Sequence, residues 1–230
     1  MGIGSLMDAN CYCSIDLLNH KHNHQYPWRL GKYMDEQKKE FVIKELNKII
    51  EEIKILIPSE VFNFDDFYIA GGCIYSLYNG KEPKDYDIFC KNKKAIKRLL
   101  KYLENNKDKC SFVTDNAISL GKFQFIIRFI GNPKTQVSKF DFKHNMFYYD
   151  GKDLVCLSEW KYLESNTLSF NSTRARDVLN ILSRIPKFIE RGMEISQREI
   201  YEILEVGTRP TNYFRERASI KKFRKGKYKY

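Results

Sequence analysis

Two aspartates stand two residues apart in an otherwise apolar segment, and their spacing suits metal chemistry. Asp85 and Asp87 lie in the run DYDIF, so on a β-strand both side chains project from one face, with Cα atoms roughly 6.5–7 Å apart. Two such carboxylates repel each other and lose hydration unless a hard cation bridges them. Asp141, in the apolar run KFDF, is a third acid. If its strand lay beside the first, the cluster would suit one or two Mg²⁺ ions for phosphoryl transfer.

A pair of glycines precedes these acids and is suited to holding phosphate. Gly71 and Gly72 follow an apolar run and open a short helical stretch. Without a Cβ atom, backbone N–H groups at such a turn can approach a phosphate closely. Ser76, on the short helix, and Lys84, next to Asp85, are further candidates for contact with a triphosphate. The alternative for both is a solvent-exposed position.

The pattern of helices and strands that must position these residues predicts an α+β domain. We expect a small mixed sheet of about four or five strands with flanking helices, followed by a short helical C-terminal region. Apolar periodicity and breaker residues predict the element boundaries. Helices are expected at 35–56, 72–79, 93–104, 174–190 and 197–204, and strands at 67–70, 85–90, 110–115, 122–131, 137–142 and 145–150.

Four regions follow from this pattern. They are an N-terminal extension (1–33), a catalytic domain (34–157), a helical region (158–208) and a basic tail (209–230). The tail interleaves aromatic residues with lysines and arginines, which fits single-stranded RNA as well as it fits a solvated, disordered tail.

The charge and the cysteines of the sequence indicate which partners and which cellular compartment to expect. The 230 residues include 40 Lys and Arg against 29 Asp and Glu, a formal net charge of +11, which favours a polyanionic partner or a lysine-rich surface. No signal peptide and no apolar run of about 20 residues occurs. The six cysteines show no disulfide framework, so we expect reduced thiols in the cytoplasm and no membrane partner. The spacing of Cys11, Cys13, His20, His22 and His24 matches no standard zinc finger and leaves zinc binding open.

The segment from Gly71 to Asp87, GGCIYSLYNGKEPKDYD, resembles the head motif of the polymerase-β-like nucleotidyltransferase superfamily. The resemblance is closest to the branch of CCA-adding enzymes and bacterial poly(A) polymerases, where G-G-x-V-R-D is followed after a few residues by a glycine and then, after four intervening residues, by D-x-D. The glycine pair, the later glycine and both aspartates of the D-x-D are in register here. Residues 184–195 are similar to the helix that follows the head domain in that branch. The compact middle also resembles relatives encoded by phages or viruses.

The resemblance implies that Asp85 and Asp87 bind catalytic Mg²⁺, that Gly71 and Gly72 hold the donor NTP, and that Asp141 is the third catalytic carboxylate. The implied activity is transfer of a nucleoside monophosphate from an NTP to an acceptor hydroxyl, with release of pyrophosphate and RNA or a tRNA 3′ end as the expected acceptor. Transfer to a protein or small molecule is one alternative. A non-catalytic nucleic-acid-binding or scaffold protein that keeps the fold is another.

Two departures limit what the resemblance implies. Tyr75-Ser76 stands where the branch has R-D, and the E-D-x-x-R element that reads the incoming base in CCA-adding enzymes has no clear counterpart. The reaction class is therefore expected, and the CCA specificity is not.

Overall fold

The computed structural model describes residues 35–173 and 178–208. The predicted N-terminal extension, its cysteines and histidines, the basic tail and the start of the predicted helix at 174–190 lie outside these ranges. No helix within them is long and apolar enough to cross a membrane.

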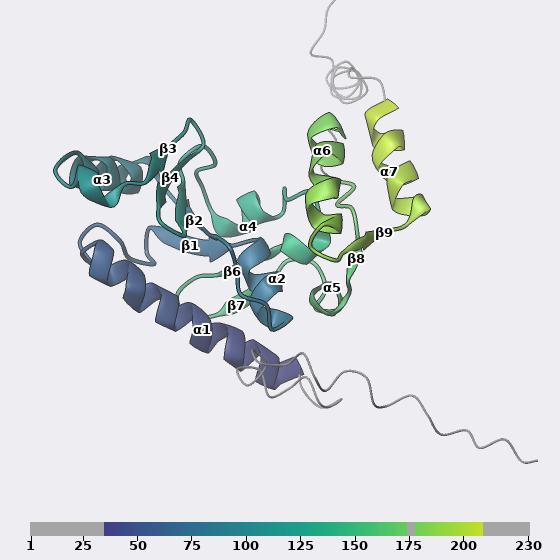
Figure 1. The fold of residues 1–230 in the computed structure, drawn as a ribbon, viewed down its shortest axis with the longest axis horizontal. Coiled ribbons are helices and arrows are strands. Elements are labelled where there is room, and N and C mark those ends of the chain that lie inside the picture. The colour runs from purple at the N-terminus through teal and green to yellow at the C-terminus, as the bar shows by residue number, and fades with distance from the viewer. Residues whose placement is uncertain (1–34, 174–177, 209–230) are drawn as a thin grey trace, which may run out of the picture.

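A seven-stranded mixed sheet forms the centre of the molecule, in the order β3-β4-β5-β2-β1-β6-β7 (Figure 1). Neighbouring strands are antiparallel except for β2 and β5, which are parallel. The strands are β1 (Phe67–Ala70), β2 (Tyr86–Cys90), β3 (Phe112–Val113), β4 (Ala117–Leu120), β5 (Phe123–Ile126), β6 (Phe147–Tyr149) and β7 (Leu154–Cys156); β8 (Thr167–Leu168) and β9 (Glu194–Ile195) form a separate parallel pair.

Seven α-helices and two 3₁₀ turns surround this sheet within the described ranges. In Figure 1, α1 runs along one side of the sheet, and α6 and α7 lie together at the end away from α3. The helices are α1 (Asp35–Leu56), α2 (Gly72–Tyr78), α3 (Lys93–Glu104), α4 (Pro133–Val137), α5 (Lys161–Glu164), α6 (Val178–Ile189) and α7 (Gln197–Thr208); the 3₁₀ turns are η2 (Lys107–Lys109) and η3 (Lys143–Asn145).

The two faces of the sheet are packed differently. Alternate residues of β1 point to opposite faces: Phe67 and Ile69 join a large core with α1, α2 and α3, whereas Tyr68 and Ala70 join a smaller cluster. Phe89 on β2 belongs to that smaller cluster. Asp87, two residues earlier, therefore projects from the face with the smaller cluster.

The sequence predicted most of these elements correctly. The helices at 35–56 and 93–104 and the strand at 67–70 have the predicted bounds, and α2 and β2 each differ by one residue. The sheet is larger than predicted because β4 and β7 are short strands with weak signals. Their pairing with β5 and β6 fixes them.

The predicted strand at 137–142 is wrong. Asn132 caps a short helix there by accepting a hydrogen bond from the Lys134 N–H (2.9 Å), and Pro133 occupies its first turn. The residues after this helix form a loop. Its carbonyls at Ser138 and Phe140 accept hydrogen bonds from the Asn171 side chain, both at 2.8 Å. Asp141 therefore lies in this loop and not in the middle of a strand.

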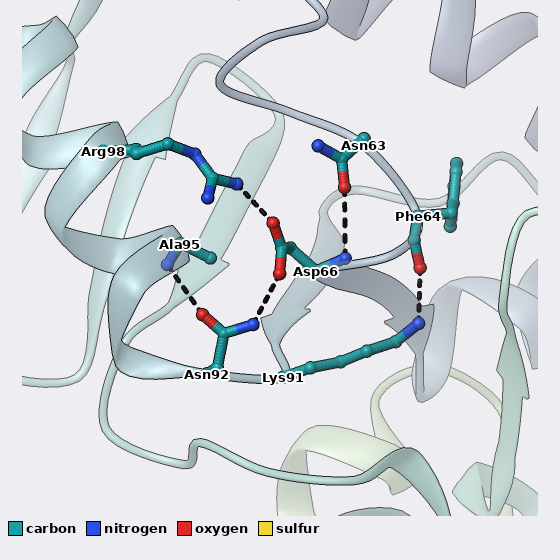
Figure 2. Close-up of polar contacts among 7 residues, drawn as sticks. All are labelled: Asn63, Phe64, Asp66, Lys91, Asn92, Ala95 and Arg98. Carbon is teal, nitrogen blue, oxygen red and sulfur yellow. Dashed lines mark hydrogen bonds and ion pairs between the residues drawn. The ribbon is translucent and has the colours of Figure 1, made fainter.

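A polar network joins the start of β1 to the start of α3 (Figure 2). The Asp66 carboxylate accepts hydrogen bonds from Arg98 and from the Asn92 side chain. Asn92 in turn caps α3 by accepting from the Ala95 N–H (2.9 Å). The hydrogen bond from Arg98, and then that from Asn92, hold the pKa of Asp66 below its ordinary value, although burial acts in the opposite direction.

Replacing Asp66 with asparagine should lower the free energy of unfolding by about 1–2 kcal/mol at pH 7, since a partly exposed, charged hydrogen-bonded pair is lost. The pKa of Asp66 is lowered in the folded state, so its stabilising effect is present above about pH 4 and is lost as the pH falls through the folded-state pKa. Urea unfolding at pH 7 and pH 3 measures both effects. Asp65→Asn, at an exposed neighbouring position, is the control. Equal losses for both variants at pH 7 would contradict the assignment.

Candidate functional site

The turn between β1 and α2 is built on a glycine that no other residue replaces without strain. Gly71 has φ 90° and ψ −144°, a conformation that L-residues rarely adopt. Its N–H donates to the Phe147 carbonyl on β6 (3.2 Å). A Cβ atom at Gly71 would lie 3.8 Å from Asp87 Oδ2 and 3.5 Å from the Phe140 ring. The glycine turn and the Asp87 carboxylate are therefore direct neighbours.

Gly72 begins α2 with ordinary backbone angles, since its φ is not positive. A Cβ atom there would come no closer than 3.8 Å to the Asn145 side chain. The first N–H groups of a helix have no acceptor within the helix. Because the Gly71 N–H already bonds to β6, the donors available to a ligand lie further on, at the start of α2.

The two predicted aspartates sit next to each other at the start of β2. Asp85 is exposed just before the strand, and Asp87 is half-buried within it. Burial raises the pKa of Asp87 to about 6, and the negative charge of Asp85 adds to this. The positive charges of Lys187 and Arg191 act in the opposite direction. The Asp87 carboxylate is thus poorly solvated and faces cations from another part of the chain.

Asp141 has a different partner from the one predicted. Its carboxylate is buried, with 7% of the residue exposed, and it forms an ion pair with Arg184 on α6. Among residues 35–173 and 178–208, no group of three or more His, Cys, Asp or Glu side chains is placed to hold a metal ion. A role for Asp141 as a third ligand beside Asp85 and Asp87 stays a prediction.

The other two candidate residues occupy the predicted elements. Ser76 is half-buried on α2, and its carbonyl accepts from the Lys81 N–H (2.8 Å). Lys84 is exposed in the turn before β2. The cationic charges that act on Asp87 come from Lys187 and Arg191 instead.

The basic residues at the end of α6 were missed as members of the site. The Lys81 side chain donates to the Arg191 carbonyl (3.4 Å), which joins this region to the loop before β2. Arg184, Lys187 and Arg191 all fall in the segment 184–195 that resembles the helix following the head domain. That resemblance was the available signal, because spacing alone does not place this helix near Asp87.

Comparison with known proteins connects the chain to a family. The model of a family described as Gabija anti-defense 2 family protein matches residues 36–174. A protein of Bacillus phage SPbetaL7, Gabija anti-defense 2, is 26% identical over 155 residues. The match covers 63% of this chain and 38% of the phage protein, so the chain matches well under half of that relative's length.

A solved structure shares the fold of this chain. A CCA-adding enzyme of Thermotoga maritima, complexed with tRNA, superposes with a TM-score of 0.53 at 16% identity, over 73% of this chain and 44% of the enzyme. A CCA-adding enzyme of Bacillus stearothermophilus, in complex with CTP, gives a TM-score of 0.47 at 15% identity over 61% of this chain and 39% of that one. The Thermotoga superposition confirms the predicted fold, a mixed sheet with flanking helices like that of nucleotidyltransferase head domains.

Gly71→Ala should lower the free energy of unfolding by about 1–3 kcal/mol, because alanine is strained at φ 90°. Gly72→Ala is the matched control. Its backbone angles are compatible with alanine, so stability should stay the same or rise by up to about 1 kcal/mol. Urea denaturation measures both. Similar losses for the two variants would contradict the role given to the Gly71 turn.

Asp87→Asn should raise the free energy of unfolding by about 1–2 kcal/mol at pH 8 in EDTA. The pKa of Asp87 is raised to about 6 in the folded state, so ionisation favours the unfolded chain. The difference from the wild type should therefore appear as the pH rises from about 4 to about 6 and be absent at pH 3. Thermal or urea unfolding across this range measures it, with Asp65→Asn as control. A destabilised Asp87→Asn protein at pH 8 would refute the assignment.

Proposed function

The chain belongs to the Gabija anti-defense 2 family, and from this premise we propose that it is a phage protein that counteracts a host defence through a metal-dependent nucleotidyltransferase site. In this proposal the protein transfers a nucleoside monophosphate from an NTP to an acceptor hydroxyl and releases pyrophosphate. Asp85 and Asp87 are the metal-binding acids, and Gly71 and Gly72 form the phosphate turn.

The observation that carries this proposal is the proximity of Asp87 to the glycine turn. The Asp87 carboxylate lies beside Gly71, at 3.8 Å from the position of a Cβ atom. A triphosphate bound at the start of α2 would therefore meet the carboxylates directly. This is the arrangement that phosphoryl transfer needs, since a cation held by the acids must also contact phosphate oxygens.

The residues present fit a divalent cation at Asp85 and Asp87. Burial and the neighbouring charge of Asp85 make ionised Asp87 unfavourable, and a hard cation relieves both effects. When bound, Mg²⁺ supplies positive charge at the reacting phosphate and lowers the pKa of a coordinated hydroxyl. Asp141 would become a ligand, and the base beside the acceptor, only by exchanging Arg184 for the metal.

The basic residues at and just after the end of α6 have a role in binding phosphate in this proposal. Lys187 and Arg191 are exposed and act on Asp87 through their charge. In that position they neutralise the triphosphate and the departing pyrophosphate. Ser76 and Lys84 remain candidates for further phosphate contacts.

RNA, including a tRNA 3′ end, is the acceptor that the protein's charge favours. The net charge of +11 attracts a polyanion, and the Thermotoga structure with the similar fold is complexed with tRNA. The family description favours a second candidate, in which the nucleotide is transferred to a protein or small molecule of the defence. A fold retained only for binding is the non-catalytic alternative.

Incubation with each α-³²P-labelled NTP, Mg²⁺, total RNA and a bacterial lysate tests the proposal. The wild type should label an acceptor. The Asp85→Ala, Asp87→Ala double variant should lose about 10³-fold or more of this activity, because metal coordination supplies several kcal/mol of transition-state stabilisation. Asp65→Ala should keep full activity.

The labelled fraction identifies the acceptor. Label in RNA supports the first candidate, and label in protein or in small molecules supports the second. Label that persists in the double variant would refute the site. If no fraction is labelled and calorimetry detects no binding of Mg²⁺ with any of the four NTPs, the proposed function is wrong.

A further inference from the structure

The strand beside Asp87 carries an amide at the position where a third acid would complete the metal site. In the parallel pairing of β2 with β5, Asp87 is the partner of Gln124. Paired residues of adjacent strands point to the same face, and neighbouring strands are about 4.8 Å apart. Gln124 is half-buried. Its side chain therefore lies next to the Asp87 carboxylate on the face of the acid pair.

The rest of this row across the sheet offers no other carboxylate or amide. The antiparallel register of β1 with β2, which pairs Ile69 with Ile88, continues to Ala70 on the other side of Asp87, and a methyl group binds no cation. Beyond Gln124 the row reaches Ser119 on β4. Asp87 is thus the one acid in the row Tyr148, Ala70, Asp87, Gln124 and Ser119.

We infer that Gln124 is the third side chain of the metal site and that its neutral amide makes the site a receptor for a metal–nucleotide complex instead of the free cation. This inference rests on the proposed function. The amide oxygen is a hard but uncharged ligand, so the sheet supplies a charge of −2. Lys187 and Arg191 further reduce the attraction for a free cation. The triphosphate must therefore bring the missing negative charge together with the metal.

This charge balance agrees with how magnesium is usually held. Mg²⁺ sites commonly use one or two carboxylates together with substrate phosphates, whereas dedicated all-protein cages are uncommon. Here the acids Asp85 and Asp87 and the oxygen of Gln124 leave the remaining positions to phosphate and water. The ion pair of Asp141 with Arg184 keeps that fourth polar group out of the set.

Calorimetric titration with Mn²⁺ alone, without nucleotide, tests the inference. Gln124→Glu should bind Mn²⁺ at least about tenfold more tightly than the wild type, since affinity rises with the number of charged ligands. Ser119→Glu is the matched control, because it places the same charge on the same face one strand further from Asp87. It should stay within about twofold of the wild type. Equal affinities for the two variants, or tight Mn²⁺ binding by the wild type, would overturn the inference.

A second variant covers the case in which the glutamate prevents folding, which urea denaturation detects. Gln124→Met has nearly the same shape and removes only the amide. It should weaken binding of Mg²⁺ with a non-hydrolysable ATP analogue about threefold to tenfold, and leave binding of that analogue in EDTA unchanged. An unchanged affinity in Mg²⁺ would also overturn the inference. These readouts are independent of transfer, so the proposed activity can fail while the role of Gln124 holds, and the reverse.

Discussion

At Gly71 the chain leaves β1 with a φ of 90° and enters α2, while its N–H remains bonded to Phe147 on β6. This one turn directs α2 to the face of the sheet that is covered by the large core. The opposite face is then free of α2 where β2 begins, and Asp87 projects there. The direction of α2 and the proximity of the turn to the Asp87 carboxylate both depend on this single residue with a positive φ.

The helix α6 determines the electrostatics on that face. Its Arg184 pairs with the buried Asp141, and Lys187, one turn further on, acts on Asp87. Phe188 lies against the rings of Phe142 and His144, with centroid distances of 5.2 and 5.1 Å. Because aromatic packing next to η3 holds the helix, its cations stay at the edge of the site. One helix therefore pairs with one acid directly and acts on the other only through charge.

The sequence was sufficient to predict the residues of the candidate site that lie close together in the chain. The two glycines and the two aspartates lie within one segment, and a strand–turn–helix–strand pattern brings them together without help from elsewhere. Strong periodicity also fixed α1 and α3. Asp141 was wrongly placed on a strand because the apolar residues around it resemble a strand pattern. In the structure, Asn132 and Pro133 start a short helix, and the side chain of Asn171 holds the loop that follows it by hydrogen bonds.

The other residues of the candidate site come together through contacts between distant segments, which the sequence spacing does not predict. Gln124 reaches Asp87 only because β5 pairs with β2 in parallel, and a shift of one residue would have turned its side chain to the other face. Lys187 on α6 and Arg191 in the turn after it act on Asp87 from a segment far along the chain. The family likeness pointed to that helix but not to its charges as partners of Asp87.

The case for a chemical role rests on the contrast between the two half-buried or buried acids. Asp141 has its guanidinium partner and behaves as a structural ion pair. Among the residues that the structure describes, Asp87 has no comparable ion-pair partner: its pKa is raised to about 6, and the cations that act on it are exposed. A group in that state makes the ionised protein less stable, and a ligand that carries positive charge to this face would remove this cost, as protonation does at low pH. This state of Asp87 favours the proposed site for a metal-bound nucleotide over a scaffold role.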